Sequence, residues 1–158
     1  MFKINLNNRG ITLLEALFAI GIVFLLFVFG IKPFEAVRDR QMLNRVVEDV
    51  EKILQSARTN SQASTDASSY GVHFEVDRAT FFAGSFYFES DPDNQTIIFD
   101  DNVNITELFL VGGGSDVVFN RITGDTNTSG SIKFSLIDNP SRFKLITVFP
   151  IGTIFSNY

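Results

Sequence analysis

Few side chains in this sequence could perform chemistry, and one of them, Glu15, stands in an unusual place. The chain has 158 residues, no cysteine and a single histidine, His73. This composition excludes thiolate zinc sites, cysteine nucleophiles and multi-histidine metal sites. Glu15 is the only charged residue in an apolar run from 11 to 31. A carboxylate in a membrane helix costs up to about 3 kcal/mol at mid-bilayer and less near an end, so we expect it to have a partner and a function.

The other candidate sites are weaker. By alternation His73 lies on the polar side of a strand, and we expect a solvent-facing residue because no serine or acid is placed to suggest a triad. The glycines at 112–114 lack the ending of a phosphate loop and predict a hairpin turn. Residues 91–94 begin like a calcium loop, but Thr96 stands where a glycine is needed, and calcium binding here stays an alternative. We predict no metal centre, no cofactor and no enzymatic activity.

The apolar run around Glu15 predicts a membrane helix. It is interrupted only by Thr12, Glu15, Gly21 and Gly30, and at ~1.5 Å per residue it would be about 31 Å long, the thickness of a bilayer's hydrocarbon core. A removable secretory signal would be shorter and would have small residues at its cleavage site. A soluble core helix would show a polar stripe. We therefore predict a retained anchor joined to a water-soluble part.

The charges on either side of the run do not set its orientation. Lys3 and Arg9 precede the run, whereas Lys32, Arg38 and Arg40 follow it. The positive-inside rule compares basic residues near the two ends of a span, and here neither end clearly dominates. The topology has to come from another signal.

That signal is the stretch Asn8-Arg9-Gly10-Ile11-Thr12-Leu13-Leu14-Glu15, which runs straight into the apolar segment. It resembles the class III signal of type IV prepilins and type II secretion pseudopilins. In that family a membrane aspartyl peptidase cleaves after the glycine on the cytoplasmic side and methylates the new amino terminus. The resemblance implies cleavage between Gly10 and Ile11, N-methylation of Ile11 and an inside-to-outside orientation. Ile11 departs from the phenylalanine that is usual there.

The resemblance also assigns a role to Glu15. In the family's filaments this glutamate pairs with the amine of a neighbouring subunit, and mispairing leaves a charge unpaired in an apolar core. Glu15 would thus set the axial register of each incoming subunit. The alternative is that Glu15 neutralises the amine of its own chain, four residues away, and both could hold at different stages.

After the run, the helix is expected to continue to about Asn60. Pro33 follows Gly30 and removes a backbone donor, which predicts a kink near these two residues. Apolar residues from Leu43 onward recur at helical spacing and predict an amphipathic helix, with a short coiled coil as the alternative. The stripe consists of Leu43, Val46, Val47, Val50, Ile53, Leu54 and Ala57.

The pattern of the rest of the chain predicts an antiparallel β head. Alternating runs separated by turn clusters predict strands at 70–76, 79–89, 96–100, 103–111, 116–121, 131–137 and 144–149. Twelve of the 18 phenylalanines follow Asn60, and we expect them to dominate the core because each buries a large apolar area. The glycine-punctuated strands near the C-terminus resemble the head of the H-type minor pseudopilin. Without cysteine, this head cannot close the C-terminal disulfide loop of many major pilins.

Together these features predict an α+β fold in which a long N-terminal helix packs on an antiparallel all-β head. The predicted parts are a leader at 1–10, a transmembrane helix at 11–31, its amphipathic continuation at 32–60, a polar loop at 61–69 and the head at 70–158. The resemblance implies a minor pilin or pseudopilin of a type IV pilus or type II secretion-like filament. It also implies a single-pass precursor in the bacterial cytoplasmic membrane, with its leader in the cytoplasm and its head outside.

The partners that the resemblance implies are the prepilin peptidase, other pilin or pseudopilin subunits, the membrane assembly platform and the lipid bilayer. A different class of function stays open, namely a signal-anchored extracytoplasmic β domain that binds a partner and never polymerises. We do not expect nucleic acid as a partner, because the net charge is −5 and the bases after 116 form a small cluster without aromatic interleaving. These bases are Arg121, Lys133, Arg142 and Lys144.

Overall fold

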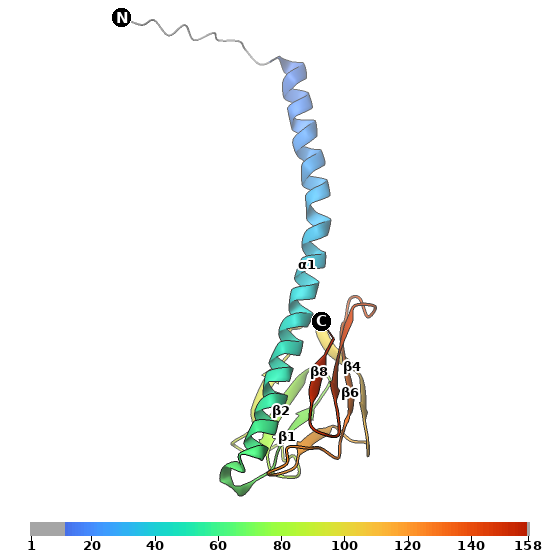
Figure 1. The fold of residues 1–158 in the computed structure, drawn as a ribbon. Helices are drawn as coiled ribbons and strands as arrows, with labels where there is room; N and C mark the ends of the chain where they lie inside the picture. The colour runs from blue at the N-terminus through green and yellow to red at the C-terminus, as the bar shows by residue number, and fades with distance from the viewer. Residues whose placement is uncertain (1–11, 158) are drawn as a thin grey trace, which may run out of the picture. The chain divides into compact units, whose positions relative to one another are not determined.

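The computed structural model describes residues 12–157, and the side chains of all of these except 28–36. Within that part of the chain, one long helix, α1 (Leu13–Gln62), is followed by a short 3₁₀ helix, η1 (Thr65–Ala67), and eight strands (Figure 1). The strands are β1 (Tyr70–Phe74), β2 (Arg78–Ala83), β3 (Gln95–Ile98), β4 (Val103–Leu110), β5 (Asp116–Phe119), β6 (Gly130–Leu136), β7 (Phe143–Val148) and β8 (Ile154–Ser156). The chain divides into two compact units between Arg38 and Asp39.

Helix α1 begins at a cap supplied by Thr12. The Oγ1 atom of Thr12 accepts a hydrogen bond from the backbone N of Glu15 at 3.3 Å, and its carbonyl accepts one from the N of Ala16 at 3.1 Å. Threonine in this position satisfies an amide group that the first helical turn leaves without a partner. The helix ends at Gln62, close to the end that the amphipathic pattern predicts.

The second unit is built around the apolar stripe of α1, as the sequence predicts. Six stripe residues are buried and Ile53 is partly buried; the buried six are Leu43, Val46, Val47, Val50, Leu54 and Ala57. They belong to one hydrophobic core that also contains residues of every described strand except β3. Full burial of an aliphatic side chain contributes about 1.5–3 kcal/mol. This half of α1 is therefore an integral part of the head.

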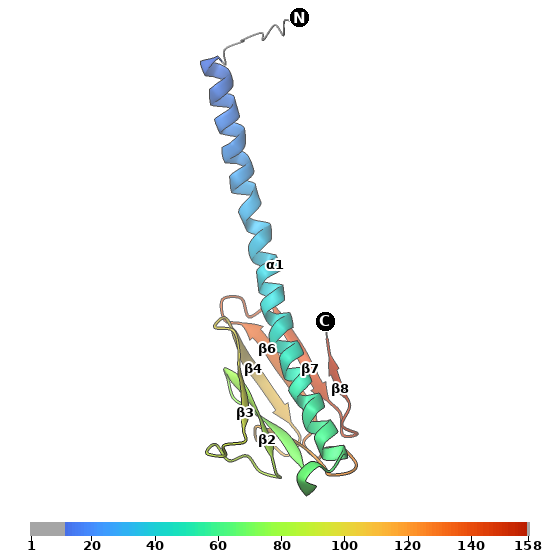
Figure 2. The same cartoon turned by 90° about the vertical axis from the view of Figure 1, so that its left-hand side faces the viewer.

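The described strands form two antiparallel sheets of four strands each, which confirms the predicted antiparallel head. Sheet A has the order β3-β2-β1-β5, and sheet B has the order β4-β6-β7-β8. Figure 2 shows the outer strands β3 and β8 on opposite sides of α1. The pattern did not predict β8, because a three-residue strand next to Gly152 is too short to show alternation.

The glycines at 112–114 connect the two sheets and do not close a hairpin as predicted. The strand before them, β4, pairs with β6 of sheet B, whereas the strand after them, β5, pairs with β1 of sheet A. All three glycines have positive φ, of 89°, 74° and 93°, a conformation that residues with side chains rarely adopt. The turn is present, but the predicted pairing is wrong. A glycine run specifies a local reversal and not the partner of each flanking strand.

Two further glycines bring distant loops together near the end of α1. A Cβ atom added to Gly152, whose φ is +79°, would lie 1.9 Å from the carbonyl oxygen of Gly124. Arg58 on α1 donates hydrogen bonds from Nε to the Gly124 oxygen at 3.3 Å and from Nη2 to the Ile151 oxygen at 3.4 Å. These contacts fasten the last loops to the helix in a chain that has no disulfide to do so.

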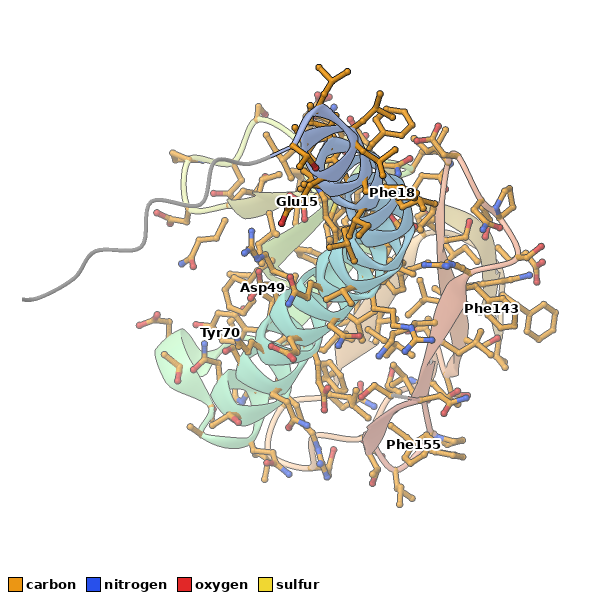
Figure 3. All side chains as sticks on the ribbon, turned by 90° about the horizontal axis from the view of Figure 1, so that it is seen from above. Glu15, Phe18, Asp49, Tyr70, Phe143 and Phe155 are labelled. Atoms are coloured by element: carbon orange, nitrogen blue, oxygen red, sulfur yellow. The ribbon has the colours of Figure 1, made fainter. Side chains whose placement is uncertain are left out.

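Phenylalanine fills only part of the core, which corrects the prediction. Six of the twelve phenylalanines after Asn60 are buried, namely Phe74, Phe81, Phe82, Phe99, Phe119 and Phe134. The other six, Phe86, Phe88, Phe109, Phe143, Phe149 and Phe155, are exposed. Figure 3 shows Phe143 and Phe155 pointing outward from sheet B. Strand alternation assigns a residue to a face of the sheet, but it does not say whether a second layer covers that face.

Candidate functional site

Residues 13–27 of α1 expose large apolar side chains on every side of the helix. Their exposed fractions between residues 13 and 27 range from 55% to 87%. They are Leu13, Leu14, Leu17, Phe18, Ile20, Ile22, Val23, Phe24, Leu25, Leu26 and Phe27. Because successive residues of a helix are about 100° apart, these side chains cover the whole circumference. Figure 3 shows Glu15 and Phe18 projecting from this part of the helix. A continuous apolar surface of this kind requires another apolar surface or medium to cover it.

Among the described residues, no helix is both long enough and apolar enough to cross a bilayer. The predicted span runs from 11 to 31, and the structure describes the side chains of residues 12–27 within it.

Glu15 lies in the first turn of α1, with an exposed side chain. A negative charge there interacts favourably with the amide groups of the helix start, by about 0.3–1 kcal/mol. Thr12 and Glu15 also have the spacing of a capping box, in which a threonine caps the helix three residues before a glutamate. The two residue types and their spacing are a helix-start signal that the sequence alone contains. Glu15 thus stabilises the start of the helix, in addition to its predicted role in assembly.

The other predicted site residues lie partly outside the structural description. Gly10 and Ile11, the predicted cleavage site, are not among the described residues. Gly30 and Pro33 both lie within α1, which is helical across them without an interruption. A bend of the helix at Pro33 stays a prediction.

His73 is not the solvent-facing residue that strand alternation predicts. Its Nδ1 atom lies 2.5 Å from Oδ1 of Asp116, which is directly opposite in the β1–β5 pair. Its ring also stacks on that of Tyr87, with centroids 4.0 Å apart and planes 7° apart. The sequence could not place Asp116 beside His73, because the pairing of β1 with β5 skips three intervening strands. His73 therefore anchors Tyr87 and its loop to sheet A.

A cavity of about 540 Å³ opens next to His73, where the end of β1 approaches β4. Its polar lining consists of His73, Glu75, Asp77, Thr106 and Ser115. Among the described residues, His73 has an acid partner but no hydroxyl partner, so the chain of nucleophile, histidine and acid that hydrolases need is not formed. This lining carries no recognisable catalytic arrangement.

Among the side chains that the structure describes, no group of three histidine or acidic side chains could hold a metal ion. In the loop that begins like a calcium loop, Oδ1 of Asp91 accepts a hydrogen bond from the backbone N of Asp93 at 3.0 Å. An aspartate that bonds to the backbone two residues on shapes a turn. The feature best suited to a function is therefore the exposed half of α1 with Glu15 at its start.

A solved structure has a fold similar to that of this chain. The crystal structure of the type IV minor pilin FimU of Pseudomonas aeruginosa matches this chain with a TM-score of 0.55, over 73% of this chain and 93% of FimU. The chain has a pilin-like fold. The two sequences are 10% identical, so the likeness concerns the fold, and it confirms the predicted α+β architecture. No family model and no curated protein sequence matches this chain.

Proposed function

We propose that this protein is a structural subunit, a minor pilin or pseudopilin, of a type IV pilus or type II secretion-like filament. The observation that carries the proposal is the uncovered apolar surface of residues 13–27 of α1, a helix that continues into a pilin-like head and holds one carboxylate in its first turn. Such a helix needs an apolar environment on all sides. A bilayer supplies that environment before assembly, and a bundle of like helices supplies it in a filament.

In this proposal the protein is made as a single-pass precursor in the bacterial cytoplasmic membrane, with its leader inside and its head outside. The prepilin peptidase cleaves between Gly10 and Ile11 and methylates the new amine of Ile11. The membrane assembly platform then moves the subunit from the bilayer into the filament. The chain acts as a substrate and a building block in these steps and not as an enzyme.

Glu15 gives the assembly step its register. A carboxylate moved into an apolar helix bundle is unfavourable unless it meets a positive group, and the amine of a neighbouring subunit is such a group. Leaving one partner of a buried pair unmatched costs about 3–5 kcal/mol. That difference disfavours a subunit placed one turn too high or too low by more than two orders of magnitude.

The test is the substitution Glu15→Leu, compared with Glu48→Leu on the exposed face of α1 within the head. We expect Glu15→Leu to insert into the membrane normally but to be missing from filaments sheared from the cells. Glu48→Leu is expected to behave like the wild type. Normal incorporation of Glu15→Leu would refute the register argument.

Mass spectrometry of the protein from peptidase-containing cells tests the processing step independently. We expect a chain that starts at methylated Ile11. A chain that keeps its original terminus would remove processing from the proposal and would favour an anchored binding domain that never polymerises.

A further inference from the structure

The outer strands of the two sheets differ in how their edges are occupied. These strands are β3 and β5 in sheet A and β4 and β8 in sheet B. The outer edge of such a strand presents backbone N–H and C=O groups to which another chain can add a strand. The head itself occupies part of this edge on β5 and β4, whereas the described residues leave the edges of β3 and β8 open.

The contacts that occupy β5 and β4 come from nearby loops. On β5, the hydroxyl of Thr126 donates a hydrogen bond to the oxygen of Val118 at 2.7 Å, and the hydroxyl of Thr128 accepts one from the N of Val118 at 3.2 Å. On β4, the backbone N of Ile105 donates to the oxygen of Val76 at 2.8 Å, and a bulge directly after Ile105 interrupts the strand. Bulges and covering loops protect a sheet edge from further pairing.

The edge of β3 has no such protection. The backbone N of Phe99 donates to the oxygen of Asp77 on the β2 side at 2.9 Å. Residues that bond to a partner strand alternate with residues that point away from it, so the backbone groups of Thr96 and Ile98 point away from β2. Within the part of the chain that the structure describes, these N–H and C=O groups have no hydrogen-bond partner. Figure 2 shows β3 on the side of the head opposite β8.

These backbone groups are suited to an extended peptide. Two N–H donors and two C=O acceptors, spaced as in a strand, pair with the backbone of another strand whatever its side chains are. The exposed side chain of Ile98, at 73%, then favours an apolar or β-branched residue directly opposite, because side chains of paired strands contact each other. The hydroxyl of Thr96 is already 3.0 Å from that of Thr80. The middle of the added strand is therefore expected to be apolar.

Acidic residues follow and precede β3. Asp91 and Asp93 stand before it, Asp100 and Asp101 stand after it, and residues 84–103 contain no lysine or arginine. Asp93 and Asp101 are exposed. Opposite charges on neighbouring strands attract and like charges repel. A strand that pairs with β3 is therefore favoured when each of its ends carries a basic residue.

The cation of the neighbouring strand does not cancel this charge. Arg78 on β2 lies opposite Ile98 in the β2–β3 pair. Its Nε atom forms ion pairs with Asp77 at 3.0 Å and with Glu75 at 3.2 Å. Two carboxylates thus offset one guanidinium, and the surroundings of the β3 edge stay acidic.

The same charges disfavour a second copy of this chain as the added strand. If two β3 strands paired antiparallel through their edges, Thr96 of each copy would lie opposite Ile98 of the other. That register brings Asp93 of each copy toward Asp101 of the other, since the two positions are equally far from the centre of the pair. Like charges directly opposite each other are destabilising. Charged residues at an edge are also a means by which proteins avoid pairing with themselves.

We propose that the free edge of β3 binds an extended segment of a different protein, which becomes a fifth strand of sheet A. The segment has apolar or β-branched residues opposite Thr96 and Ile98, and a lysine or arginine at each end. The inference goes beyond the proposed function. It concerns the second unit alone and requires neither polymerisation nor a membrane.

Strand β8 offers a comparison within the same head. The backbone N of Asn157 donates to the oxygen of Leu145, and by the same alternation the backbone groups of Ile154 and Ser156 point away from β7. Residues 149–157 contain no charged side chain. The two open edges thus share their backbone pattern and differ in charge, so a basic strand should select β3.

The probe is the peptide Lys-Thr-Val-Thr-Val-Thr-Lys with blocked termini, which places a valine opposite Thr96 and Ile98 and a lysine near each acidic end. Binding to the full chain in detergent micelles is followed by the fluorescence anisotropy of a dye on the peptide. We expect about ten-fold tighter binding than for the same peptide with glutamate in place of both lysines. Salt should reduce this difference because it screens charges. The peptide with proline in place of both valines should not bind, because proline has no N–H group.

Amide hydrogen exchange, measured by NMR, locates the bound strand. At saturation with the lysine-ended peptide, we expect the amides of Thr96 and Ile98 to exchange about ten-fold more slowly. The amides of Ile154 and Ser156 on β8 should not change. The amide of Ile97 faces β2 and reports whether the β2–β3 pair stays formed.

Two pairs of variants test the backbone and the charge separately. Ile98→Pro removes an outward N–H but no bond to β2, and it should weaken binding about five-fold. Ile98→Val keeps that N–H and should bind like the wild type. Asp101→Asn should weaken binding of the lysine-ended peptide about three-fold. Glu48→Gln, on the exposed face of α1 within the head, should have no effect.

Several results would overturn the proposal. One is the absence of binding by the lysine-ended peptide at millimolar concentration, and another is equal affinity for the lysine-ended and glutamate-ended peptides. Binding that leaves the amides of Thr96 and Ile98 unprotected, or that protects β8 equally, would place the peptide elsewhere. Protection of Thr96 and Ile98 that rises with protein concentration, without any peptide, would assign the edge to a second copy. None of these measurements involves Glu15 or Gly10, so the proposed function is tested separately.

Discussion

The same substitution at two places on α1 should have opposite consequences. Leu54 lies in the head core with none of its surface exposed, whereas Leu17 is 67% exposed. Leu54→Ala removes about 1.5–3 kcal/mol of burial and leaves a cavity, and leucine-to-alanine changes in cores cost about 2.7–5 kcal/mol in total. We therefore expect the free energy of unfolding of the head to fall by about 3 kcal/mol, a change of about two orders of magnitude in the unfolding equilibrium.

Leu17→Ala should leave the unfolding of the head unchanged, because Leu17 is exposed and does not belong to the buried core. The assay is thermal unfolding of the full chain in detergent micelles, followed by the circular dichroism of the strands. A loss of 3 kcal/mol corresponds to a fall in Tm of roughly 10 °C for a domain of this size. For incorporation into filaments we expect the reverse order of the two effects. Leu17→Ala should reduce incorporation more than its effect on the stability of the head explains.

Two results would refute the inference that the two parts of α1 have different roles. One is a Leu54→Ala head that loses less than about 1 kcal/mol, since the stripe would then not be part of the core. The other is a Leu17→Ala head that is destabilised as much as the Leu54→Ala head.

Two further predictions concern the loops. Gly152→Ala should destabilise the head by more than about 2 kcal/mol, because the new Cβ would overlap the carbonyl of Gly124. Gly113→Ala should cost only about 1 kcal/mol in the same thermal assay, because Gly113 also has a positive φ but lies in open space. Hydrogen bonds from Thr123 and Asn120 hold the pKa of the Asp125 carboxyl below its ordinary value of 3.8. The stability that these hydrogen bonds contribute is therefore present above about pH 4, and it is lost as the pH falls through the lowered pKa. Thr123→Val should move that pKa back toward 3.8 in an NMR titration, and an unchanged pKa would show that the Thr123 hydroxyl has no such effect.

Elements with a strong period could be predicted from the sequence, because periodicity reports burial directly. The stripe that includes Val50 and Leu54 repeats at helical spacing, and these residues are buried. Strands such as β1 and β6 alternate, and they lie close to their predicted positions. The antiparallel head follows from the same pattern together with its turn residues.

Pairing between distant strands could not be predicted in this way. His73 and Asp116 meet only because β1 pairs with β5, and no local pattern encodes that register. The exposure of Phe143 could not be predicted for a related reason. Its side chain lies on an uncovered face of the sheet, and strand alternation does not report how many layers a fold has. At the start of α1, by contrast, the spacing of Thr12 and Glu15 is a local helix-cap signal that can be recognised in the sequence alone.

The cross-connection at residues 112–114 has a consequence for how the head acquires its structure. Sheet A needs β5 as its last member, yet β5 follows β4 in the chain, and β4 belongs to sheet B. Neither sheet is therefore made from an uninterrupted stretch of sequence, and the head cannot be completed one sheet at a time from its N-terminal end. Contacts between segments far apart along the chain slow folding. A chain that folds as it is made from its N-terminus would keep the stripe of α1 partly uncovered until β8 has been made, so the stripe would be accessible to other apolar surfaces throughout synthesis of the head.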